Sequence, residues 1–193
     1  DEEFPRKETS EMAGKVVVAA ERVRDLVAGL LEASAAEAGR VSLERRPCEL
    51  LSVARRVAEA QAEGAGRKQI RIVVEGGPVV VTGDPGAIVQ VLENVVSNAV
   101  KFSPLGTTVK VSVRSDGGAG LVDVEDEGPG ITEADRARLF AKFSRLSARP
   151  TGGESSTGLG LSIVKTLTEA MGGEVSLESP PGRGARFRVR LPL

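Results

Sequence analysis

The stretch from Gln90 to Pro104 restricts most strongly how this chain can fold, because its apolar and polar residues separate onto different sides of a helix. Asn94, Asn98 and Lys101 are four and three residues apart, so they share one helical face. The apolar residues fall largely on the other side: Val91, Leu92, Val95, Val96 and Ala99. Amide oxygens suit Mg2+ and an ammonium suits phosphate, although a plain solvated face would show the same stripe.

The composition excludes several kinds of site. The chain has 193 residues with no histidine and one cysteine, Cys48, so it can hold neither a catalytic histidine nor an internal disulfide, and a zinc site is disfavoured. A formal net charge of −1 gives no electrostatic reason to expect nucleic acid or anionic membrane as a partner. No apolar run approaches the roughly 18–20 residues that span a bilayer, and neither a signal peptide nor a Walker-type phosphate loop is visible.

Turn and capping residues divide the chain into alternating helices and strands. Gly39 ends a first helix, Pro47 is expected to open a second, and Asp84-Pro85 supplies an N-cap and first position for the helix with the polar stripe. Alternation predicts strands at 41–43, 70–74, 79–81, 108–114, 120–125, 174–178 and 185–191, a turn at 115–118 and a helix at 159–171. Helices that interleave with hairpins predict an α/β (α+β) fold, a two-layer sandwich of a mixed sheet and helices.

Residues 10–38 predict one long helix, because they are rich in Ala, Leu, Glu and Arg. Apolar residues recur at the spacing of a coiled-coil or bundle seam: Val16, Ala19, Val23, Leu26, Leu30 and Ala33. One helix cannot bury such a stripe, so it needs a partner helix, a second chain or the domain that follows.

Three further blocks follow the polar stripe in a fixed order. Residues 126–131 read DEGPGI, residues 139–145 read LFAKFSR, and residues 157–165 read TGLGLSIVK. One glycine-rich block alone is a weak signal, since Gly-x-Gly marks many turns. In this order and spacing, the four blocks resemble the N, G1, F and G2 boxes of bacterial sensor histidine kinases. The resemblance covers about residues 40–193 and implies the GHKL, or Bergerat, ATP-binding fold.

The resemblance implies two parts. Residues 1–40 would be the second helix and linker of the dimerisation and phosphoacceptor hairpin, and residues 41–193 the catalytic ATP-binding domain. The implied reaction transfers the γ-phosphoryl group of ATP to a histidine, for relay to an aspartate of a response-regulator receiver domain. That histidine is not in this chain. Either the chain begins after the first hairpin helix, which the lack of a recognisable sensor domain favours, or the natural protein lacks the histidine. In both cases we expect no kinase activity from the chain alone.

By the same resemblance, the cofactors are ATP and Mg2+. Asn98 would coordinate Mg2+ through its side-chain oxygen, while Asn94 orients Asn98 or binds a metal-bound water. Lys101 would reach the phosphates, and Phe102 would lie beside the adenine unless it is a plain core residue. Arg145 would meet the γ-phosphate unless it is a solvated surface residue. The implied catalytic residues are thus Asn98, Lys101 and Arg145.

The glycine blocks imply the rest of the nucleotide site. Asp126 would accept a hydrogen bond from the adenine 6-amino group, which favours ATP over GTP, although an Asp there also suits a turn cap. Gly128 and Gly130 would permit positive φ and close approach to the base, on which Ile131 could pack. The block at residues 157–165 would bind phosphate at a helix N-terminus, unless its glycines serve flexibility alone. The residues implied in this contact are Thr157, Gly158, Leu159, Gly160 and Leu161.

Residues 132–157 correspond to the lid that the family places over the nucleotide. Phe140 and Phe143 are expected to anchor its base in the core. Ala141 replaces the acidic residue common at that position, which leaves the local lid contacts open. Residues 152–156 contain no packing residue, so we expect them to be mobile.

Two other functions fit the same residues. One is a regulatory nucleotide-binding module that dimerises through the N-terminal helix and has no kinase activity. The other is a gyrase-like or chaperone-like GHKL ATPase, which hydrolyses ATP with a glutamate in the N-box helix, where Glu93 is available. For the leading hypothesis, the expected partners are a receiver domain, a phosphoacceptor hairpin and a second copy in the full-length protein. The fragment itself is expected to be a monomer, either cytoplasmic or the cytoplasmic portion of a membrane-anchored sensor.

Overall fold

The computed structural model describes residues 12, 16, 43–144, 146–154, 157–180 and 182–193. The predicted helix over residues 10–38 lies outside this part except for Met12 and Val16, which are helical and exposed. Arg145, predicted to meet the γ-phosphate, also lies outside the described residues.

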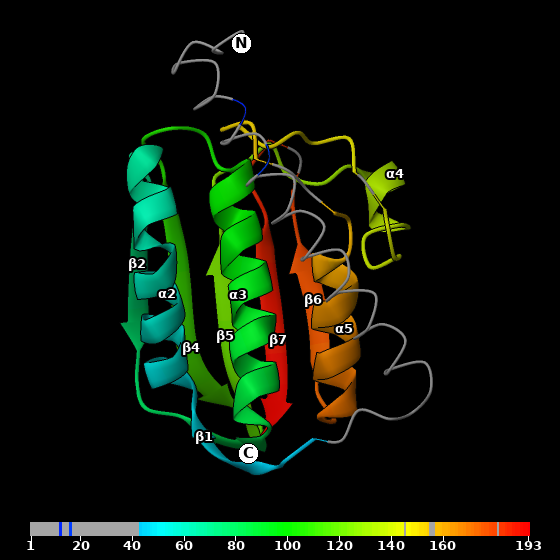
Figure 1. Ribbon diagram of the computed structural model, residues 1–193. Coiled ribbons are helices and arrows are strands. Elements are labelled where there is room, and N and C mark those ends of the chain that lie inside the picture. The colour runs from blue at the N-terminus through cyan, green and yellow to red at the C-terminus, as the bar shows by residue number, and fades with distance from the viewer. Residues whose placement is uncertain (1–11, 13–15, 17–42, 145, 155–156, 181) are drawn as a thin grey trace, which may run out of the picture.

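Three helices lie side by side on one face of a five-stranded sheet (Figure 1). The strand order is β2-β4-β5-β7-β6, with β2 and β4 parallel and the other neighbours antiparallel, while β1 and β3 form a separate pair. The strands are β1 (Arg46–Glu49), β2 (Arg71–Gly76), β3 (Val80–Gly83), β4 (Thr108–Asp116), β5 (Ala119–Glu125), β6 (Glu174–Glu178) and β7 (Arg186–Pro192). The helices are α2 (Leu50–Arg67), α3 (Pro85–Phe102), α4 (Glu133–Arg136) and α5 (Gly160–Ala170). The predicted mixed-sheet sandwich is confirmed.

The central helix α3 begins where its capping residues predict. The Asp84 carboxylate accepts a hydrogen bond from the Ala87 amide at 3.0 Å, and Pro85 is the first helical residue. The predicted apolar face is 3% exposed or less: Val91, Leu92, Val95, Val96 and Ala99. It belongs to the same core as a sheet face rich in valines, so the core is mainly aliphatic, as the scarcity of aromatic residues requires.

Two boundaries differ from the sequence predictions. Pro47 lies inside β1, and α2 starts at Leu50 because Glu49 is its N-cap, accepting from the Leu51 and Ser52 amides at 2.7 and 2.8 Å. A proline fits there because β1 has a single strand neighbour. The strand expected at 41–43 is also wrong at its described residue, since Leu43 is irregular.

The hairpin of β4 and β5 is longer than predicted. Both strands continue to a two-residue turn, Gly117-Gly118, whose φ angles are 56° and 77°. Two successive positive φ angles match the twist of an antiparallel hairpin, and glycine adopts them without strain. The sequence pattern had placed the turn over 115–118.

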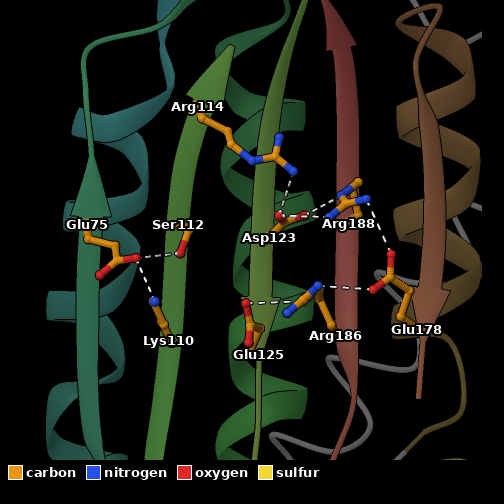
Figure 2. Close-up of polar contacts among 9 residues, drawn as sticks. All are labelled: Glu75, Lys110, Ser112, Arg114, Asp123, Glu125, Glu178, Arg186 and Arg188. Carbon is orange, nitrogen blue, oxygen red and sulfur yellow. Dashed lines mark hydrogen bonds and ion pairs between the residues drawn. The ribbon is translucent and has the colours of Figure 1, made fainter. Parts of the chain in front are cut away.

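The sheet face away from the helices carries a ladder of charged side chains (Figure 2). Asp123 of β5 is its centre: Arg188 donates to both of its oxygens at 2.6 and 3.1 Å, and Arg114 donates at 3.1 Å. Arg186 pairs with Glu125 and Glu178 across the neighbouring strands. These contacts link four adjacent strands on the open side of the sheet.

No helix in the described part of the chain is long and apolar enough to cross a membrane.

Candidate functional site

A hollow opens between the second half of α3, the end of β5, the start of β7 and the segments flanking α4, with about 450 Å³ of empty space when the open solvent at its mouth is included. Its lining is mostly apolar, with one carboxylate and one amide, which is typical of a small-molecule site. The lining residues are Asn98, Phe102, Asp126, Pro129, Gly130, Ile131, Leu146, Ala148, Leu161, Ala185 and Phe187. The structure therefore brings together the predicted residues Asn98, Phe102, Asp126, Gly130, Ile131 and Leu161.

Asp126 follows the end of β5, and two backbone amides hold its carboxylate. Its Oδ1 accepts from the Gly128 amide at 2.8 Å and the Ala185 amide at 3.2 Å. Within the described chain no hydrogen bond reaches Oδ2, so this oxygen is available to a ligand. Burial raises the pKa of Asp126, against the two amide hydrogen bonds, which lower it. The carboxylate thus caps a turn with Oδ1, while Asp126 itself lines the hollow.

Glycines allow the backbone to approach Asp126 closely. A Cβ on Gly184 would lie 1.8 Å from the Asp126 carbonyl oxygen, and a Cβ on Gly128 would lie 2.8 Å from Asp126 Oδ1. Gly130 has a φ of 76°, in the left-handed region, but Gly128 has no positive φ, so the expectation of positive φ at both was wrong. Gly184 was not predicted as a site residue, although the Gly-Arg-Gly before the last strand was a signal for close approach.

Asn94 and Asn98 face the start of α5. Asn94 Nδ2 donates to the Gln90 carbonyl at 2.9 Å, and a Cβ added to Gly160 would lie 2.6 Å from Asn94 Oδ1. No hydrogen bond joins the two asparagines, so Asn94 does not orient Asn98 directly. Asn98 lines the hollow without a hydrogen bond to any described residue. Its amide is therefore available to a ligand.

Helix α5 begins in the second glycine block, at Gly160, and no side chain caps its first amides. Such amides are open to an anion. Gly158 has a packing reason of its own: its φ is 72°, and a Cβ there would lie 2.7 Å from the Ser144 carbonyl oxygen. Leu159 is 1% exposed, so its side chain belongs to the core, and Thr157 only accepts a 3.4 Å bond from the Leu159 amide.

Residues 83–193 match the family described as histidine kinase-, DNA gyrase B- and HSP90-like ATPase. The chain belongs to this ATPase family. The circadian input-output histidine kinase CikA of Synechococcus elongatus is 34% identical over 176 residues, 89% of this chain and 23% of CikA. The sensor protein TorS of Escherichia coli is 38% identical over 169 residues, 85% of this chain and 18% of TorS. The chain thus spans less than a quarter of the length of these two relatives.

Solved histidine kinases share the fold. Full-length ShkA, solved in complex with AMPPNP, has a TM-score of 0.82 and 30% identity, over 98% of this chain and 40% of that one. The mycobacterial sensor histidine kinase MprB has a TM-score of 0.67 and 28% identity, over 77% of this chain and 97% of that one. Within its family, this chain is a catalytic, ATP-binding domain of the sensor histidine kinase kind.

In this kinase domain, Lys101 lies at the end of α3 and does not line the hollow. Its carbonyl accepts from Lys68 Nζ at 2.9 Å and from the Thr151 amide at 3.0 Å. Lys68 is 6% exposed, also donates to the Val100 carbonyl at 2.6 Å, and pairs with Glu154 at 3.3 Å. Lys68 therefore caps the C-terminal carbonyls of α3 and links Glu154 to this helix end. The sequence pattern did not predict this role.

The lid residues divide differently from the prediction. Phe140 packs against the core as expected. Phe143 does not: it is 55% exposed, and its backbone has a left-handed φ of 59° where it passes close to Gly158. Ser179, which is 1% exposed, was not predicted. Its hydroxyl accepts from the Ile131 amide and donates to the Gly184 carbonyl, both at 2.8 Å, and so joins two walls of the hollow.

Proposed function

We propose that the hollow binds the adenine of ATP and that, in the full-length protein, the domain transfers the γ-phosphoryl group to a histidine outside this chain. The observation that carries the proposal is Asp126 Oδ2, an acceptor without a partner in the described chain, at the edge of an apolar hollow lined by Phe102 and Ile131. The adenine 6-amino group donates to such an oxygen, whereas the 6-oxo group of guanine cannot. The ShkA complex with AMPPNP supports nucleotide binding by this fold.

The residues near α5 fit a phosphate chain with Mg2+. Asn98 would hold the ion through its amide oxygen, and the amides at the start of α5 would bind phosphate oxygens. The described residues contain no group of three or more His, Cys, Asp or Glu side chains that could hold a metal. Negative charge at the ion would therefore come from the phosphates, and bound Mg2+ would neutralise part of it. Lys101 and Arg145 are the proposed cationic contacts to the phosphates.

The chain supplies binding and positioning, and another chain segment supplies the nucleophile. Because the sequence has no histidine, the acceptor imidazole belongs to a phosphoacceptor hairpin that must present it in line with the γ-phosphate. We propose that the phosphoryl group passes on to an aspartate of a receiver domain. We also propose that the full-length protein is a homodimer and that this domain works in the cytoplasm.

Hydrolysis by a glutamate of α3 is less well supported. Glu93 is exposed and is not among the residues that line the hollow. A general base must come within hydrogen-bond reach of the attacking water at the phosphate. The position of Glu93 on the outer side of α3 therefore favours the kinase over a gyrase-like ATPase.

Calorimetric titration of the chain with ATP and GTP tests the nucleotide site. We expect binding of ATP with Mg2+ and at least about tenfold weaker binding of GTP, since a mismatched polar pair in a buried site costs about 1–3 kcal/mol. A well-folded chain that does not bind ATP would contradict the proposal. Transfer is tested by adding a hairpin that carries the acceptor histidine, with radiolabelled ATP, beside the same hairpin with that histidine replaced by alanine.

A further inference from the structure

A buried carboxylate of α4 holds the outer wall of the hollow. Leu146 and Ala148 line the hollow, and Ser147 between them contacts α4 instead. The Ser147 amide donates to Asp135 Oδ2 at 3.1 Å, and the Ser147 hydroxyl donates to the same oxygen. Asp135 is 3% exposed and twelve residues away along the chain. The contact between Ser147 and Asp135 therefore fixes the backbone that carries Leu146 and Ala148.

The carboxylate is itself fixed from other directions. The Thr132 hydroxyl donates to Asp135 Oδ2 at 2.9 Å, and Arg138 Nη2 donates to Oδ1 at 3.3 Å. The hydrogen bonds from Ser147, with smaller contributions from Thr132 and Arg138, hold the pKa of Asp135 below its usual range. The group is therefore an ionised acceptor at neutral pH, and its hydrogen bonds are the stronger, charge-assisted kind.

Helix α4 contacts two of the segments that form walls of the hollow. It has only four residues, so it depends on tertiary contacts for its place. Arg136 Nη2 donates to the Ser179 carbonyl at 2.8 Å, and the Ser179 hydroxyl holds the Ile131 amide. One side of α4 is therefore tied to the wall that contains Ile131, and Asp135 ties the other side to the wall that contains Leu146 and Ala148.

We propose that Asp135 is a positioning residue for the nucleotide, which acts through Ser147 to set Leu146 and Ala148 against the bound base. The proposal rests on the proposed function, because it takes the hollow as the adenine site. Without the contact, the wall must be ordered when the nucleotide binds, and the conformational entropy lost in that step weakens affinity. A contact that only stabilised the fold would leave affinity unchanged.

The test is calorimetric titration of the full chain with ADP in the presence of a chelator, so that no metal contributes. Ser147→Ala removes the hydroxyl donor and leaves the side chains of Leu146 and Ala148 chemically unchanged. We expect about fivefold weaker ADP binding, the ratio that corresponds to one lost hydrogen bond. Ser147→Thr retains a hydroxyl and should restore most of the affinity. Arg138→Ala, which removes an exposed contact to the other oxygen of the same carboxylate, is the matched control and should bind ADP within about twofold of wild type.

A double-mutant cycle separates positioning from mere stability. If Asp135 acts through Ser147, Asp135→Asn combined with Ser147→Ala should weaken ADP binding no more than the stronger single variant does. The proposal is overturned if Ser147→Ala lowers the thermal midpoint yet binds ADP like wild type, or if the two losses simply add. Wild-type chain that fails to bind ADP would overturn the proposed function itself, a result seen before any variant is made.

Discussion

Asp126 uses one carboxylate oxygen to hold the backbone and leaves the other to the hollow. Because burial raises its pKa, the charged form is disfavoured in the folded chain, so the ionised group destabilises the domain above that pKa. Asp126→Asn keeps an acceptor for the Gly128 and Ala185 amides and removes the charge. We therefore expect this variant to unfold at a higher urea concentration than wild type at pH 7, while binding ATP at least about tenfold more weakly.

The pH dependence gives a second check on the same residue. The stability gained by Asp126→Asn should shrink as the pH falls through the raised pKa of Asp126 toward the unfolded value near 3.9, because wild type then becomes neutral too. Urea unfolding at several pH values measures it. A gain that stays constant down to acid pH would mean that the carboxylate charge is not its cause.

Asn98 is the residue proposed to make ATP affinity depend on Mg2+. Its amide lines the hollow and has no hydrogen bond within the described chain. Asn98→Ala should therefore abolish the increase in ATP affinity that Mg2+ gives, and leave metal-free ADP binding within about twofold. Glu93→Ala, an exposed position on the same helix, is the control and should change neither quantity. Loss of steady hydrolysis in that control would instead favour the ATPase alternative.

At the scale of elements, Lys68 joins the ends of α2 and α3. Its buried ammonium serves two carbonyls of α3 and the Glu154 carboxylate. Lys68→Met retains most of the apolar stem but leaves these acceptors without their donor, so we expect the free energy of unfolding to fall by about 2 kcal/mol. Arg67→Met, at an exposed neighbouring position, should cause little change. Equal losses in the two variants would contradict the capping role.

The elements that sequence predicted well are those with local signals. Asp84-Pro85 sets the start of α3 through a hydrogen bond between residues three apart in sequence, and alternating valines mark β4 and β5. The prediction that Pro47 opens a helix was wrong, because the first turn of a helix and an edge strand both accept proline. The pocket residues Asn98, Phe102 and Asp126 came from the motif blocks. Ala185 could not be found in this way, since its pairing with Asp126 spans 59 residues and leaves no local pattern.

At the scale of the whole molecule, the charged ladder on the open sheet face connects segments that are distant in sequence (Figure 2). Asp123 has a side chain only 7% exposed and accepts from Arg188, 65 residues later in the chain. The same two strands bring Asp126 and Ala185 together at the edge of the hollow, but there the contacts are made by the backbone groups of Ala185, to the amide and to Oδ1 of Asp126. The ladder and the nucleotide site should therefore respond differently to one substitution.

Asp123→Asn tests that separation. The amide has one acceptor oxygen in place of two and carries no charge, so charge-assisted hydrogen bonds from the arginines are lost at a buried group, and we expect the free energy of unfolding to fall by about 1.5–3 kcal/mol. ATP affinity measured well below the unfolding temperature should stay within about twofold of wild type. Glu75→Gln, in the exposed pair with Lys110 on the same face, is the matched control and should change stability much less. A large loss of ATP affinity in a folded Asp123→Asn variant would show that the ladder, rather than the local backbone contacts, sets the position of Asp126.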